Sequence, residues 1–182
     1  MKVTATELPE VKLIEPRVFG DERGWFLETW RMERYREHGI GPEFVQANAS
    51  SSRRGVLRGL HYQWPQPQGK LVWVSSGRVL DVAVDIRPSS PRYGRWVAFE
   101  LDDQQHRQLW IPPGFAHGFQ VLSESACFNY LCTEPYRAEF DAAIAWNDPD
   151  IEVNWPLTEP ELSPKDAAAP HLAAIERDRL PR

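Results

Sequence analysis

The sequence predicts a mainly β protein that folds as a jelly-roll barrel with a few short peripheral helices. Sixteen prolines, eight tryptophans and eight phenylalanines occur beside few long helical patterns, and this composition is typical of strands joined by tight turns. Short strand-like segments follow one another at close spacing along the chain. Many short strands at such spacing favour a barrel or jelly roll.

The strands can be placed from apolar alternation and from the turns between them. The clearest is Leu80–Ile86, in which four aliphatic residues alternate with Asp81, Ala83 and Asp85, so its two faces must meet different surroundings. The other expected strands, in chain order, are Phe26–Trp30, Phe44–Ser50, Leu57–Gln63, Lys70–Ser75, Trp96–Leu101, Gln108–Ile111, Gly118–Leu122 and Ala126–Cys132. Turn residues separate several of these strands.

Two helices and one domain complete the predicted organisation. The helices are expected at Arg31–His38, which Gly39 ends, and at Leu172–Asp178. A chain of 182 residues is long enough for one domain with a core and too short for two ordinary ones. We therefore predict a single domain, 1–182, whose core spans about residues 3–157 and whose C-terminal segment, 158–182, packs near the functional site.

Charge and composition exclude several classes of partner. The net charge is −5 and the isoelectric point is about 5.6, so a broad basic surface for nucleic acid is not expected. No apolar run approaches the roughly 18 residues that span a bilayer. Cys127 and Cys132 are too few for a disulfide framework and are read as reduced core residues. These features predict a soluble cytoplasmic protein whose partner is a metabolite.

A histidine and a lysine on neighbouring strands indicate acid–base chemistry. His61 lies in the strand Leu57–Gln63, and Lys70 begins the next expected strand. Imidazole has an unperturbed pKa of about 6.5 and accepts a proton at neutral pH, while a fixed ammonium stabilises an oxyanion. Taken alone, each residue has a simpler explanation, as a hydrogen-bonded core histidine or a surface lysine. A charge at the start of an apolar strand nevertheless needs a reason.

Six motifs, taken together, resemble a known family. They are Phe19–Gly24, Val56–Gln63, Asp81–Arg87, Trp110–Phe119, Trp146–Pro149 and Leu162–Asp166. The sequence is similar to the dTDP-4-dehydrorhamnose 3,5-epimerases, cofactor-free enzymes of the cupin fold in the dTDP-L-rhamnose pathway, in order and with few gaps over about residues 3–170. The resemblance implies a carbohydrate epimerase that inverts C5 and C3 of dTDP-4-dehydro-6-deoxy-D-glucose and gives dTDP-4-dehydro-β-L-rhamnose.

The resemblance also implies the catalytic residues. His61 matches the base that removes the protons beside the C4 ketone, and Lys70 matches the residue that faces the C4 oxygen. Tyr130 matches the proton donor on the other side of the sugar, which inversion requires because a base that returns its own proton restores the starting configuration. An acidic partner should orient the imidazole. Asp166 matches this partner, and Asp81 is a second candidate.

The residues that hold the substrate follow from the same match. They are Arg23, Glu28, Gln46, Asn48, Arg58, His117, Asp141 and Lys165. Guanidinium groups suit a diphosphate because their fork of donors is planar and always charged, and side-chain amides both donate and accept hydrogen bonds. Each arginine taken singly is more often a solvated surface charge, so only the ordered set supports these assignments.

The spacing of Arg58 and His61 conflicts with a shared ligand. In an ideal strand Leu57, Gly59, His61 and Gln63 point to one side and Arg58 to the other. A twist or bulge could bring both side chains to one ligand, or Arg58 could serve a second subunit. Members of the family form dimers in which strands are shared, so a homodimer is expected.

Departures from the family pattern leave the number of inverted centres open. Leu131 stands where many members have lysine, Ala47 where aspartate is common, and Asp141 where glutamate often contacts the substrate. Relatives on antibiotic-sugar pathways invert only C3 or only C5 with the same proton-handling residues. A single-centre epimerase is therefore the alternative to double inversion.

Two other classes of protein differ from this sequence in the residues that they require. A metal-dependent cupin usually carries a His-x-His pair with a carboxylate and a further histidine, whereas the five histidines here include no such pair, and no metal is expected. A non-catalytic sugar-nucleotide-binding cupin would keep the arginines and aromatic residues. It has no need for His61, Lys70 and Tyr130 together.

Overall fold

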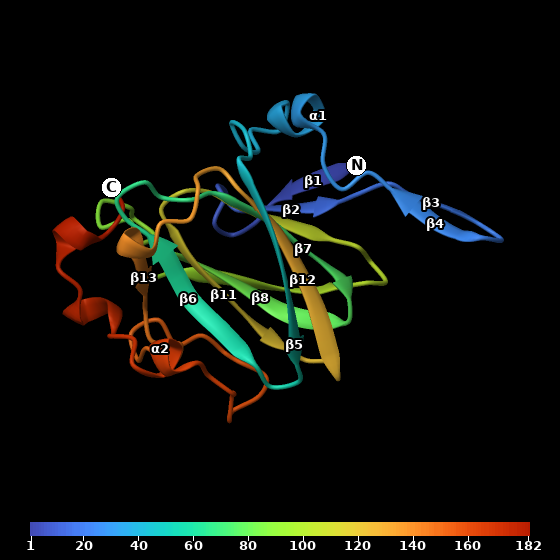
Figure 1. Cartoon of the computed structure of the whole chain (residues 1–182). Coiled ribbons are helices and arrows are strands. Elements are labelled where there is room, and N and C mark those ends of the chain that lie inside the picture. Colours follow the sequence, from blue (N-terminus) through green and yellow to red (C-terminus); the bar gives the residue numbers. More distant parts are fainter.

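Two antiparallel sheets face each other and form the barrel (Figure 1). The computed structural model describes all residues, 1–182. The first sheet has the order β1 (Lys2–Ala5), β2 (Lys12–Glu15), β10 (Gln108–Ile111), β7 (Lys70–Ser76), β12 (Ser125–Cys132) and β5 (Gln46–Arg53). The second has the order β13 (Asp141–Ala143), β6 (Leu57–Gln63), β11 (Phe115–Val121), β8 (Arg78–Asp85) and β9 (Trp96–Asp102). The predicted jelly roll is therefore confirmed.

The remaining elements lie outside the two sheets. A hairpin of β3 (Val18–Asp21) and β4 (Gly24–Leu27) extends away from the barrel, and α1 (Met32–Arg36) follows it (Figure 1). The C-terminal part contains α2 (Pro164–Ala167) and the single-turn 3₁₀ segments η2 (Leu172–Ala174) and η3 (Arg177–Arg179), after η1 (Ala138–Phe140). None of these helices has the length and apolar character needed to cross a bilayer.

Apolar side chains fill the space between the sheets and also cover the outer face of the five-stranded sheet. Val72 and Phe128 from one sheet meet Phe119 and Ala83 from the other in the central cluster. The second cluster lies outside β6 and β8, under the C-terminal segment. Val82 of β8 belongs to this outer cluster while its neighbour Ala83 belongs to the central one. The prediction that the two faces of this strand meet different surroundings is therefore confirmed.

The predicted elements differ from the structure mainly where they are short. Leu57–Gln63 and Gln108–Ile111 match β6 and β10, whereas Phe26–Trp30 is displaced relative to β4. The four-residue strands β1 and β2 were not expected, because so few residues carry little alternation. The predicted helix Leu172–Asp178 is wrong. That segment forms η2 and η3, because Leu172 is drawn into the outer cluster and tertiary packing overrides local propensity.

A β-bulge in β6 resolves the conflict between Arg58 and His61. His61 is paired with His117 of β11, and Arg58 with Phe119, so three steps along β6 oppose two along β11. The extra residue returns Arg58 and His61 to the same side of the sheet. Leu57 accordingly joins the outer cluster. The expectation that Leu57 and His61 point to the same side of the strand is therefore wrong.

The bulge requires glycine at position 59, because β6 and β11 approach each other there too closely for a Cβ atom. Its φ is +123°, and a Cβ atom at this position would lie 2.5 Å from Cα of Gly118. Replacement of Gly59 by alanine should therefore destabilise the fold by about 2–4 kcal/mol, through backbone strain and overpacking. Gly94 is the matched control, since its φ is +77° but a Cβ there meets nothing within 4 Å.

Urea denaturation of the two alanine variants would test this reading. Gly94→Ala should lose only the cost of the strained backbone, about 1 kcal/mol. Equal losses in the two variants would contradict the close approach as the reason for glycine at position 59.

Candidate active site

Two adjoining cavities lie between the sheets, and His61, Lys70 and Tyr130 line both of them. The larger cavity has a volume of about 310 Å³ and the smaller one about 190 Å³. Gln46, Asn48, Asp141 and Lys165 line the larger cavity; Ser50, Arg58, His117, Phe119 and Phe128 line the smaller one. The three predicted catalytic residues therefore lie where the two cavities meet.

The imidazole and the phenol come from opposite walls of the barrel. His61 belongs to β6 in the five-stranded sheet, and Tyr130 belongs to β12 in the six-stranded sheet. In the latter sheet Tyr130 is paired with Val72 of β7, a residue of the central cluster. Lys70 is two residues from Val72 and so faces the same side. A ligand in these cavities would have His61 on one side and Lys70 and Tyr130 on the other.

A buried carboxylate holds His61 from the C-terminal segment. His61 Nε2 lies 2.5 Å from Asp166 Oδ1, and the Asp166 side chain is only 3% exposed. Asp166 lies in α2, which begins after the N-cap Ser163. Ser163 Oγ accepts a hydrogen bond from the Asp166 backbone N–H and donates one to Oδ2 at 2.9 Å. The short helix therefore fixes the carboxylate that orients the imidazole.

The electrostatics of Asp166 suit a partner of a charged imidazole. Burial opposes ionisation of this carboxyl, but the hydrogen bond and charge of His61, together with the Ser163 hydroxyl, lower the pKa of Asp166 below its ordinary value. Nδ1 of His61 makes no hydrogen bond with the protein. A neutral ring that donates through Nε2 to Asp166 therefore keeps Nδ1 as a proton acceptor.

Burial acts in opposite directions on Lys70 and Tyr130. It lowers the pKa of the Lys70 ammonium, against the opposing effects of Cys132, Asp141 and Asp81. It raises the pKa of the Tyr130 phenol, so this side chain is protonated at neutral pH. Neither side chain forms an ion pair, and both are available to a ligand.

Asp81, the second candidate for the partner of His61, bonds a different histidine. Its Oδ2 lies 2.8 Å from His117 Nε2. Each of the two cavity-lining histidines thus has a separate carboxylate. No group of three or more His, Cys, Asp or Glu side chains is arranged to hold a metal ion.

The mouth of the larger cavity is tied together by polar contacts. Lys165, beside Asp166, forms an ion pair with Asp141 of β13, and the Tyr136 hydroxyl donates to Asp141 at 3.1 Å. The Tyr136 backbone N–H donates to Gln46 Oε1 at 2.7 Å. Tyr136 was not predicted from the sequence, because a tyrosine in a loop carries no pattern that separates it from other exposed aromatic residues.

Two predicted substrate contacts lie away from the cavities of their own chain. Arg23 and Glu28 line neither cavity. Arg23, in the turn of the β3–β4 hairpin, pairs with Asp21 at 2.6 Å, and Glu28, just after β4, pairs with Arg34 at 2.9 Å. The structure brings the other predicted contacts to the cavities and leaves these two on a separate part of the molecule.

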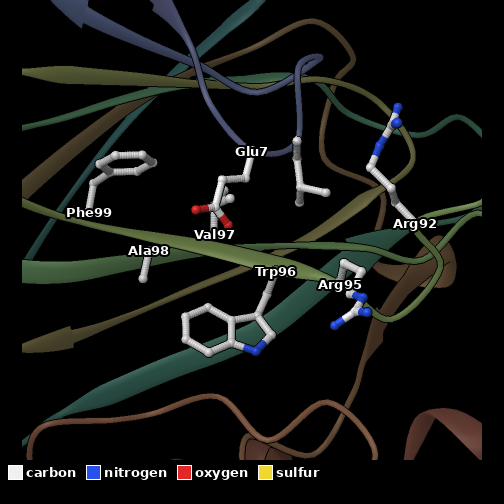
Figure 2. A pocket seen from close by; sticks show the side chains of 8 residues that line it. Glu7, Arg92, Arg95, Trp96, Val97, Ala98 and Phe99 are labelled. Atoms are coloured by element: carbon white, nitrogen blue, oxygen red, sulfur yellow. The ribbon is translucent and has the colours of Figure 1, made fainter.

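A larger hollow, about 690 Å³ in volume, lies along the edge strand β9 (Figure 2). Its lining includes Glu7, Arg92, Trp96 and Phe99 but no histidine, cysteine or tyrosine. None of the residues predicted from the sequence reaches it. It lacks a group that exchanges protons near neutral pH, so the candidate acid–base site is the pair of cavities between the sheets.

The fold and the site together define a class: a cupin-type jelly-roll barrel whose inner cavities are lined by an aspartate-paired histidine and a partly buried tyrosine. The family model described as dTDP-4-dehydrorhamnose 3,5-epimerase matches residues 5–174. The chain belongs to this family.

Individual relatives agree with this assignment. A dTDP-4-dehydrorhamnose 3,5-epimerase of Pseudomonas aeruginosa is 52% identical over 168 residues, which are 91% of this chain and 93% of the relative. One of Neisseria gonorrhoeae is 50% identical over 181 residues; the match covers 99% of this chain but 55% of the relative's length. The crystal structure of a Legionella pneumophila 3,5-epimerase in complex with dTDP-4-keto-L-rhamnose is 52% identical, with a TM-score of 0.97 over 100% of this chain and 97% of that one.

The Asp166–His61 pair should make stability depend on pH. Because the native pKa of Asp166 lies below the ordinary value of 3.8, the stabilisation is fully present above that value and is lost as the pH falls through the native pKa. Asp166→Asn should therefore cost about 1–3 kcal/mol at pH 7 and progressively less in acid. Urea unfolding from pH 7 to pH 3 measures this difference, with Asp178→Asn as the control. A loss of unfolding free energy in Asp166→Asn that does not change with pH would contradict an ionic contribution from the Asp166–His61 pair.

Proposed function

We propose that the protein is an epimerase that inverts C5 and C3 of dTDP-4-dehydro-6-deoxy-D-glucose and gives dTDP-4-dehydro-β-L-rhamnose. The observation that carries this proposal is that His61, bonded to Asp166, and Tyr130 line the same cavities from opposite sheets. Membership of the family and the ligand named in the Legionella pneumophila structure support the substrate.

The proposed reaction begins with removal of a proton beside the C4 ketone. His61 takes the proton from the carbon, and Asp166 stabilises the imidazolium that forms. The electron pair of the broken C–H bond becomes an enolate, whose oxygen faces the Lys70 ammonium. In other enzymes loss of one such donor costs about 3–4 kcal/mol of transition-state stabilisation.

Inversion follows from the position of the second proton donor. The enolate carbon is planar and can be protonated on either face. Tyr130 donates its phenolic proton from the wall opposite His61, and exchange with solvent then restores both residues. The same cycle at C5 and at C3 accounts for double epimerisation without a cofactor.

Binding of the nucleotide is assigned to the polar and cationic residues of the site. Lys165 and Arg58 supply positive charge for the diphosphate, and Gln46 and Asn48 supply amides that donate and accept hydrogen bonds at the larger cavity. Asp141 holds Lys165 at the mouth.

We further propose a homodimer in which each β3–β4 hairpin reaches the cavities of the partner. The hairpin exposes three aromatic side chains, Phe19, Trp25 and Phe26, the last at 69% exposure. An apolar surface of this kind is typical of a contact with another chain. Such a dimer would deliver Arg23 and Glu28 to the partner's substrate.

We also infer a location in the cytoplasm. Both cysteines are free thiols, Cys127 partly buried and Cys132 buried. Reduced cysteines of this kind suit a reducing compartment, where the sugar nucleotides of the proposed reaction are available.

Incubation with the keto sugar nucleotide in D₂O tests the reaction. The unaltered protein should incorporate deuterium at C3 and C5, read by NMR and mass spectrometry. His61→Ala should abolish exchange at both carbons, because the base is lost. Tyr130→Phe should retain some exchange but lose inversion, because the enolate still forms while the opposite face has no donor. His171→Ala and Tyr93→Phe, at exposed positions, are matched controls that should leave both readouts unchanged.

Each alternative class gives a distinct result in the same experiment. Exchange at one carbon alone would replace double inversion by a single-centre epimerase. An unaltered protein that binds the substrate and exchanges nothing would be a sugar-nucleotide-binding cupin. Exchange retained in His61→Ala would refute the proposed base.

Mixed dimers test the assignment of the hairpin. His61→Ala and Arg23→Ala chains are co-expressed with different tags, and total activity is compared with each variant alone. If Arg23 serves the partner, one of the two sites in every mixed dimer is intact, and about a quarter of the unaltered activity returns on statistical assembly. If Arg23 serves its own chain, every site lacks one residue and no activity returns. Light scattering checks that both variants remain dimeric.

A further inference from the structure

A second histidine–carboxylate pair lies beside His61 on the five-stranded sheet. His117 Nε2 is 2.8 Å from Asp81 Oδ2, and both residues are buried. His117 is the cross-strand partner of His61, yet His61 is bonded to Asp166. The proposed base does not require Asp81, and the buried carboxylate must have another role.

The hydrogen bonding of Asp81 is directed entirely at His117. Its other oxygen, Oδ1, is buried without a hydrogen-bond partner. Burial raises the pKa of Asp81, while the charge and hydrogen bond of His117 and the charge of Lys70 oppose that rise. A fully buried carboxyl with a single hydrogen-bond partner is costly, and this one hydrogen bond goes to the imidazole of His117.

This contact determines which nitrogen of His117 faces a ligand as an acceptor. An ionised carboxylate only accepts hydrogen bonds, so Nε2 carries the proton and Nδ1 keeps its lone pair. Arg58 and Lys70 line the same cavity. Nδ1 makes no hydrogen bond with the protein.

Two cationic side chains line the smaller cavity, and aromatic rings pack closely around His117. Arg58 and Lys70 only donate hydrogen bonds. Phe128 stacks on His117 with ring centroids 5.8 Å apart, and Phe119 stacks on Phe128 at 4.1 Å. The aromatic contacts and the Asp81 bond together prevent the imidazole from turning over, so its acceptor is fixed in place.

We infer that Asp81 is a positioning residue that makes His117 a hydrogen-bond acceptor in the smaller cavity, and that this acceptor selects a free hydroxyl group of the hexose. The second part rests on the proposed function. In the proposed substrate only C2 and C3 carry free hydroxyls, because C1 bears the diphosphate, C4 is the ketone, C5 bears the ring oxygen and C6 is a methyl group. A cavity built around an acceptor discriminates against a sugar that lacks its donor, because the acceptor is then left unpaired.

The tautomer can be measured in the ligand-free protein and does not depend on any activity. Long-range ¹H–¹⁵N spectra of ¹⁵N-histidine-labelled protein, with His117 assigned from the spectrum of His117→Gln, should show His117 protonated on Nε2 alone. Asp81→Asn should give a mixture of tautomers, because an amide can present either its oxygen or its NH₂ group. Asp166→Asn is the matched control, which should change the signals of His61 and leave those of His117.

The selection is tested with 2-deoxy and 3-deoxy analogues of the proposed substrate, by exchange at C5 in D₂O. The unaltered protein should lose at least about 100-fold in kcat/KM on one analogue. In Asp81→Asn this discrimination should fall to less than about tenfold, with KM for the parent substrate rising more than kcat falls.

The two measurements separate failure of this inference from failure of the proposed function. A charged His117, or one protonated on Nδ1, in the unaltered protein would overturn the role of Asp81 whatever the enzyme does. Undiminished discrimination in Asp81→Asn would overturn the selection of a hydroxyl. Absence of exchange with the parent substrate would instead refute the proposed reaction, and the spectra would still decide the tautomer.

Discussion

The hydrogen bond between His61 and Asp166 is the interaction on which the candidate site depends. A carboxylate that is 3% exposed is stable only when its charge is matched by donors, and here these are the imidazole and the Ser163 hydroxyl. The bond joins a strand of the barrel to a segment with little regular structure of its own. It also fixes the orientation of the ring. The same hydrogen bond therefore both orients His61 and attaches the C-terminal segment to the barrel.

The barrel also positions Lys70 and Tyr130, the other two predicted catalytic residues. Strands β7 and β12 are adjacent, and strand alternation alone sends Lys70 and Tyr130 to the inner face. The central cluster stops where these polar residues begin, since Val72 and Phe128 are core residues and Tyr130 only packs against them. The sheets thus provide a rigid apolar base and a polar opening from the same strands.

Sequence patterns predicted the parts of this architecture that are encoded locally. The alternation in Leu80–Ile86 indicated a strand with two different environments, and the motif around His61 indicated the acid–base site. Sequence patterns could not predict the side-chain pairings that depend on tertiary structure. Asp81 and Asp166 were both plausible partners of His61, and only the paths of β8 and α2 decide that one bonds His117 and the other His61. The bulge was equally hidden, because Gly59 signals backbone freedom without saying which strand it approaches.

The long sequence separation within the His61–Asp166 pair affects how the site is acquired during synthesis. The two residues are 105 positions apart, and every strand of both sheets precedes Asp166 in the chain. Chains emerge from the ribosome in sequence order and N-terminal parts fold first. A nascent chain can thus close its barrel before Asp166 is available to His61, so the candidate site is completed only after the strands that surround it.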